Sequence, residues 1–254
     1  MKKKSKILIS AFVFAALSLT SGVLWAQGKF DQPVSKPLVI LIALVALALV
    51  PILLTMVTSF VKIAVVLALI RNALGTQQIP PNQIITGLAM ILTIYIMVPV
   101  GMDIYRETGS VIESSSNQGF FSQATVALLQ EGFKKGREPM RAFLLKNAGE
   151  KDRVLFFNLA KRMRKGPDRE SLKSDDFMIL IPSFVVSELS EAFQIGFVIF
   201  LPFLVIDMVV ANILLALGMF QLSPITVSLP FKLLLFVLVD GWYLIARGLI
   251  LGYV

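Results

Sequence analysis

The sequence predicts an all-α protein made of broken apolar helical hairpins with an amphipathic helical segment in the middle. Hydrophobic residues make up 56% of the chain and charged residues only 16%, whereas soluble domains usually carry roughly a quarter charged residues. The apolar residues form two long blocks that prolines interrupt. Each block exceeds the roughly 20 residues that one membrane crossing needs. We therefore expect a protein of the membrane or of a hydrophobic assembly.

Two missing residue types limit the chemistry that the chain can perform. It contains no cysteine and no histidine, so disulfide and thiolate chemistry is excluded. The usual general base near neutral pH and the commonest metal ligand are also absent. We expect no enzymatic activity, no cofactor and no metal site. The net charge of +8 suits the flanks of apolar segments, where it orients a membrane protein, and we expect no nucleic-acid partner.

Residues 1–26 have the layout of a secretory signal peptide, with a lysine-rich start, an apolar run and Ala26 as the cleavage residue. Leu24 stands where a small residue is preferred, so an uncleaved membrane helix is the alternative. Both interpretations direct the chain to the inner membrane of a bacterium-like cell. Residues 27–37 follow as a short polar lead-in.

The first apolar block, residues 38–105, predicts a helical hairpin. Pro51 should kink or break its first helix, which we expect to end near Thr58 and to be followed by a second helix over 60–74. That second helix contains Lys62. A lysine in apolar surroundings either extends its amine to an interface or pairs with an acid, and both alternatives stay open.

The tip of this hairpin carries clear signals for a helix end. Gly75 suits a C-terminal cap, and Pro80 and Pro81 prevent the helix from continuing. Asn82 can cap the next helix, which we expect over 84–105.

The polar middle of the chain, residues 106–176, predicts amphipathic helices, because its apolar residues recur at helical spacing among charges. We expect a loop over 106–119, a helix over 120–145 with a new piece starting at Pro139, and a second helix over 152–164.

The second apolar block, residues 177–254, predicts another helical hairpin. Its first part is again too long for one crossing, and we expect Pro182 and Pro202 to divide it. Residues 231–254 should form a last apolar helix. Between them lies a short loop, residues 218–224, which could be an ordinary hairpin turn or, if several subunits meet on an axis, a flexible plug across a pore.

Three acids lie in this apolar block. Glu188 and Glu191 are three residues apart and share one face of a helix, and Asp207 follows later. Acids in such surroundings cost several kcal/mol unless they are paired or hydrated. They therefore belong either to an ion-paired network between subunits or to a pore or ion site. The available cations in apolar segments are Lys62, Arg71, Lys232 and Arg247.

Three long stretches resemble the FliP/SctR family of bacterial type III protein export gates. They are TSFVKIAVVLALIRNALGTQQIPPNQ (58–83), IPSFVVSELSEAFQIGFVIFLPFLVIDMVVANILLALGM (181–219) and SLPFKLLLFVLVDGW (228–242), and the resemblance covers about residues 38–254. It implies a pentameric ring that assembles with Q/S-family and R/T-family subunits and further export apparatus membrane proteins. The resulting channel would pass unfolded secreted proteins across the inner membrane of an injectisome or a flagellum.

The resemblance also implies roles for particular residues. The loop residues Met219, Phe220 and Gln221 match a methionine-rich gasket across the closed channel, although the polar Gln221 departs from the usual run of methionines. The acids become a polar seam between subunits, formed by Glu188, Glu191, Asp207 and Lys62.

Smaller features of the sequence bear on whether the chain belongs to the injectisome branch or to the flagellar branch of this family. Lys62 and the sequences at 95–101 and 222–232 favour the injectisome, whereas a signal peptide is typical of the flagellar proteins. An ion-coupled secondary transporter that uses Glu188, Glu191 and Asp207 is the alternative function. Such transporters commonly contain internal repeats, and the two apolar blocks show no convincing sequence similarity.

Overall fold

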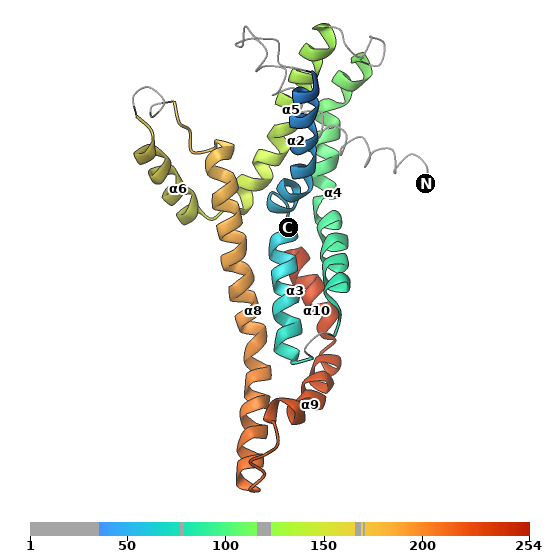
Figure 1. Ribbon diagram of the computed structural model, residues 1–254, viewed down its shortest axis with the longest axis vertical. Coiled ribbons are helices and arrows are strands. Elements are labelled where there is room, and N and C mark those ends of the chain that lie inside the picture. The colour runs from blue at the N-terminus through green and yellow to red at the C-terminus, as the bar shows by residue number, and fades with distance from the viewer. Residues whose placement is uncertain (1–35, 77–78, 116–122, 166–168, 170) are drawn as a thin grey trace. The chain divides into compact units, whose positions relative to one another are not determined.

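The computed structural model describes residues 36–76, 79–115, 123–165, 169 and 171–254. Regular structure in these residues is α-helical, which confirms the predicted fold class. The predicted signal peptide and most of the lead-in lie outside them. The helices (Figure 1) are α2 (Lys36–Met56), α3 (Phe60–Leu74), α4 (Asn82–Ser115), α5 (Gln123–Asn147), α6 (Glu150–Met163), α8 (Phe177–Ala216), α9 (Pro224–Leu238) and α10 (Gly241–Leu251).

The described residues group into two compact units. The first contains α2, α5 and α4 from Val98 onward; the second contains α3, α4 up to Met97, α6, α8, α9 and α10. Every residue that the sequence analysis proposed for a site lies in the second unit.

The core of the second unit is built around α3. One continuous cluster of buried side chains joins α3 to α4, α8, α9 and α10. Figure 1 shows α3 running beside α8, while α9 and α10 follow in red. At Gly196 of α8, an added Cβ would lie 2.3 Å from Leu69 Cδ1 of α3. A glycine is therefore needed here for close helix packing.

The end of α3 agrees with its sequence. Gly75 is the C-cap in the left-handed conformation, with φ of 74°, and its N–H donates to the carbonyl of Asn72. The cap predicted at Asn82 is wrong, because α4 already includes that residue. The Asn82 side chain instead accepts a hydrogen bond from Arg71 of α3.

The break between α2 and α3 lies where it was predicted, at 57–59. The predictions that prolines divide helices are wrong elsewhere. Pro139, Pro182 and Pro202 all lie inside helices. Pro51 lies inside α2, so the helix does not break there, and the kink stays a prediction. Each proline removes one backbone hydrogen bond, but helical stability in proteins comes mostly from packing. The 40-residue helix α8 packs on α3, α6 and α9, so it continues through both of its prolines.

Two further predictions are corrected. The loop expected from residue 106 is helical up to Ser115, and the Thr108 hydroxyl there donates to the carbonyl of Ile104. The last apolar helix is two helices, α9 and α10, bent by 60°. Asp240 at the bend has a positive φ of 52°, and the Phe236 ring packs directly on Gly241, where a Cβ would approach it to 2.3 Å.

Two of the described helices are long and apolar enough to cross a membrane, namely α4 over Asn82–Gly109 and α8. Up to four spans are reached if each of two bent helix pairs counts as one. These properties fit a membrane protein.

Candidate functional site

A buried charge centre joins α3, α8 and the C-terminus. It consists of Lys62, Glu188, Glu191 and Tyr253. The Lys62 Nζ lies 2.9 Å from Glu188 Oε1 and 2.6 Å from Glu191 Oε2. The Lys62 and Glu188 side chains are 4% and 0% exposed, whereas Glu191 is 50% exposed. Of the two alternatives for this lysine, the structure therefore shows the pair with acids.

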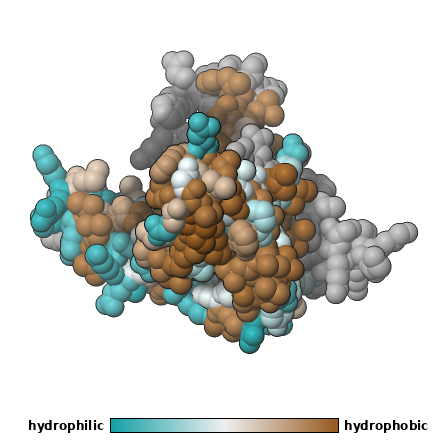
Figure 2. Space-filling view, turned by 90° about the horizontal axis from the view of Figure 1, so that it is seen from below, coloured by the Kyte–Doolittle hydropathy of each residue, from teal (hydrophilic) through white to brown (hydrophobic). Residues whose placement is uncertain are grey.

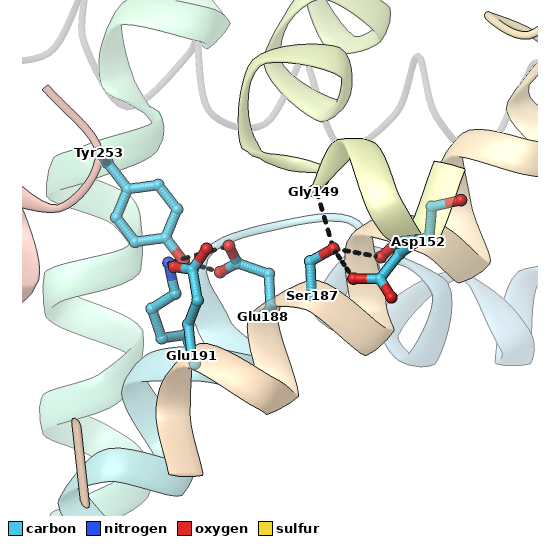
Figure 3. Close-up of polar contacts among 8 residues, drawn as sticks. Gly149, Asp152, Ser187, Glu188, Glu191 and Tyr253 are labelled. Atoms are coloured by element: carbon cyan, nitrogen blue, oxygen red, sulfur yellow. Dashed lines mark hydrogen bonds and ion pairs between the residues drawn. The ribbon is translucent and has the colours of Figure 1, made fainter. Parts of the chain in front are cut away.

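Tyr253 completes the buried charge centre and was not found from the sequence. Its hydroxyl donates to Glu188, and the Lys62 Nζ lies 4.4 Å from the centre of its ring. Figure 3 shows the tyrosine reaching toward the two glutamates of α8. A single tyrosine one residue from the chain end carries no pattern that predicts such a contact.

The preceding residue of α8 makes a second polar junction. The Ser187 hydroxyl accepts a hydrogen bond of 2.8 Å from the Gly149 N–H and lies 2.7 Å from Asp152 Oδ2, to which it can donate. In Figure 3, dashed lines join the Ser187 hydroxyl to both Gly149 and Asp152, at the start of α6. Gly149 is the N-cap of α6 and has no side chain to cap the helix. Ser187 therefore supplies a capping partner from another helix.

Asp207 belongs to a separate polar cluster. It lies 16 residues after Glu191 in the same helix, which corresponds to about 24 Å. Lys232 Nζ of α9 contacts Asp207 Oδ2 at 2.7 Å, and the Ser228 hydroxyl also donates to this carboxylate. The same amine lies 3.4 Å from the carbonyl of Ala73, near the end of α3, where the helix dipole favours a cation.

These contacts limit what the acids can do. Glu188 and Asp207 are each held by a lysine amine and a hydroxyl. Within the described parts of the chain, no group of three or more acidic side chains could hold a metal ion. Both clusters are arranged to join helices, which is the role that buried ion pairs with added hydrogen bonds can fill.

The loop proposed as a gasket lies at the turn from α8 to α9. Gly218 has a φ of 70°, which suits a helix end, and the Met219 N–H donates to the carbonyl of Leu214. The side chains beyond it face outward, and Phe220 is 76% exposed. Figure 2 looks onto this end of the second unit and shows a largely hydrophobic surface. Met219 and Leu222 of the same turn are also exposed in the described structure, so the turn presents a group of apolar side chains, a kind of surface that often marks an interaction site.

An all-helical chain with buried ion pairs and broad exposed apolar faces is typical of a subunit of a membrane-associated assembly. Comparison with known proteins leads to the same class of protein. The FliP family model matches residues 43–249. The chain is 45% identical to the "Yop proteins translocation protein R" of Yersinia pestis, over 84% of this chain and 95% of that protein. It is 42% identical to the "Flagellar biosynthetic protein FliP" of Bacillus subtilis, over 87% of this chain and 94% of that protein.

The chain belongs to the FliP family. This confirms the resemblance that its three long stretches indicated. The "Virulence protein YscR" of Salmonella typhimurium is also 42% identical, over 86% of this chain and 97% of that protein. Virulence and flagellar relatives therefore match at similar identity, and identity alone favours neither branch.

Proposed function

We propose that the chain is a core, channel-forming subunit of the type III protein export apparatus, which passes unfolded proteins across the bacterial inner membrane. The observation that carries the proposal is the family match over residues 43–249. Relatives with names from protein translocation and from flagellar biosynthesis cover most of the chain. A shared export function explains why both kinds of protein resemble it.

The exposed surface supports assembly into a ring of several copies with Q/S-family and R/T-family subunits and further export apparatus membrane proteins. Monomeric soluble proteins rarely expose apolar patches larger than a few hundred Å². Here one helix alone exposes many large apolar side chains, among them Phe193, Phe197, Val198, Leu201, Val205, Met208 and Val209 of α8. Neighbouring subunits or lipid must cover them.

The site residues receive roles in this proposal. Met219, Phe220 and Gln221 line the closed channel as its gasket, because they lie on an exposed turn. In the proposed seam between subunits, the half-exposed Glu191 is the acid best placed to reach a neighbour. Lys62, Glu188 and Asp207 form ion pairs within the chain. In this proposal they hold in place the helices that carry the seam.

The role proposed is structural rather than enzymatic. The relatives are named as translocation and biosynthetic proteins, and none of the names quoted describes a transporter of ions or solutes. The ion-coupled alternative would need acids that can exchange an ion, but the buried acids already hold lysine amines. For the branch, we favour the injectisome, on Lys62 and on the sequences at 95–101 and 222–232.

The proposal is tested by deleting the gene for this chain in its own host and measuring secreted proteins in the medium. We expect secretion of the export substrates to stop and a plasmid copy to restore it. Loss of virulence effectors would indicate the injectisome, and loss of flagellin would indicate the flagellum. Normal secretion of both classes in the deletion strain would contradict the proposal.

A further inference from the structure

We infer that Tyr253 is the positioning residue of the buried charge centre, so that the last two residues of the chain are needed to hold α10 on α3 and α8. This inference concerns the fold of one protomer. It does not depend on the proposed export function.

The charges of the centre explain why a tyrosine is needed. One amine, that of Lys62, faces the two carboxylates of Glu188 and Glu191. A single cation shared by two acids leaves an excess of negative charge. Glu188 is fully buried, so water cannot compensate, and a buried carboxylate needs further donors. The Tyr253 hydroxyl donates to its Oε2 while Lys62 faces its Oε1.

The tyrosine ring adds a second contact to the same centre. Lys62 Nζ lies 4.4 Å from the ring centroid, which is within the range of a cation–π interaction. Tyr253 thus contacts the cation with its ring and an anion with its hydroxyl. A phenylalanine would keep the first contact and lose the second.

The backbone fixes the tyrosine at the end of α10. The Gly252 N–H donates to Gly248, and the Tyr253 N–H donates to Ile250, so the last turn stays ordered beyond the helix. α10 buries only Gly241, Ile245 and Leu249. Ala246 and Ile250 add partly buried contacts with the core, and Tyr253 adds a polar anchor beyond the last turn of α10.

The first test compares Tyr253→Phe with the wild-type full chain, purified in mild detergent, by thermal unfolding. A hydrogen bond to a charged group in the buried centre is lost, so we expect the unfolding midpoint to fall by roughly 5 °C. Val254→Ala is the matched control, because that neighbouring side chain is 87% exposed and the midpoint should not change. An unchanged midpoint in Tyr253→Phe would overturn the inference.

A second variant separates positioning from simple packing. Glu191→Gln removes the competing carboxylate, so that the Lys62 amine forms an ion pair with Glu188 alone. In the Tyr253→Phe background, we expect Glu191→Gln to reverse at least half of the decrease in the unfolding midpoint. In the wild-type background, Glu191→Gln should change the midpoint little. If Tyr253→Phe lowers the midpoint equally whether residue 191 is Glu or Gln, the Tyr253 hydroxyl does not compensate for the shared lysine, and the inference is overturned.

A third measurement keeps the test valid if unfolding in detergent is irreversible. The chain has no cysteine, so Ser183→Cys would place its only thiol at a fully buried position, five residues or about one and a half helical turns before Glu188. We expect a maleimide to label this thiol at least several-fold faster when residues 253–254 are deleted. Equal labelling rates with and without the last two residues would overturn the inference.

Discussion

At the scale of single residues, the buried lysine makes the clearest prediction for stability. Lys62→Met removes the cation and leaves the Glu188 carboxylate buried without it. Breaking a buried pair in this way typically costs about 3–5 kcal/mol. We expect the free energy of unfolding to fall by that amount in a denaturant titration.

The control for Lys62→Met neutralises the acids as well. The triple variant Lys62→Met, Glu188→Gln, Glu191→Gln contains no uncompensated charge and should recover most of the lost stability, since apolar or neutral replacements of a buried ion pair are often well tolerated. If the triple variant is as unstable as the single one, the cost comes from packing rather than from charge.

Gly196 makes a second prediction at this scale. Gly196→Ala would bring a Cβ to 2.3 Å from Leu69 Cδ1 and to 3.1 Å from Leu69 Cβ. Overpacking of this kind typically costs about 1–3 kcal/mol. Thermal unfolding should show the loss, and Leu69→Ala in the same chain should relieve part of it.

Gly248→Ala is the matched control for Gly196→Ala. Gly248 also lies inside a helix, but nothing lies within 4 Å of its added Cβ. Alanine is the better helix former by about 1 kcal/mol, so this variant should be as stable as the wild type or more stable. Equal destabilisation by both substitutions would show that the contact with Leu69 is not the cause.

At the scale of helices and loops, the gasket makes the most direct functional prediction. Met219→Ala with Phe220→Ala removes two exposed apolar side chains of the α8–α9 turn and should leave assembly intact. If they seal the closed channel, the membrane should become permeable to small solutes, which dye uptake in cells measures.

The control for the gasket lies in the same turn. Ser223 precedes α9 and makes no side-chain cap hydrogen bond, so Ser223→Ala should leave dye uptake unchanged. Deletion of 218–224 should give the strongest leak. If dye uptake is unchanged after this deletion while the assembly is present in the membrane, the loop does not seal the closed channel.

The helices show how far local sequence signals can be followed. Gly75 ends α3 as predicted, because a left-handed C-cap requires a residue without Cβ strain. The prolines of α8 gave the wrong prediction, because packing against neighbouring helices outweighs a local hydrogen-bond loss. The bend between α9 and α10 was missed, because it coincides with the left-handed Asp240 and with a contact between the Phe236 ring and Gly241, neither of which a local pattern predicts.

At the scale of the whole molecule, the family was predicted from three long motifs, and the family match over residues 43–249 confirms it. The composition of the buried charge centre could be predicted only in part. Lys62 was a candidate partner for the acids because cations are scarce in the apolar segments. Tyr253 was not, because it meets Glu188 across 65 residues and no local pattern links the two.

The central claim is that the chain works as one subunit of an export channel, and its purification with its partners tests this most directly. The full chain would be co-expressed with its neighbouring export genes, extracted in mild detergent, and its mass measured together with the proteins that remain bound. We predict an oligomer of this chain that retains Q/S-family and R/T-family subunits. A stable monomer that binds neither partner and transports a small solute would contradict the account.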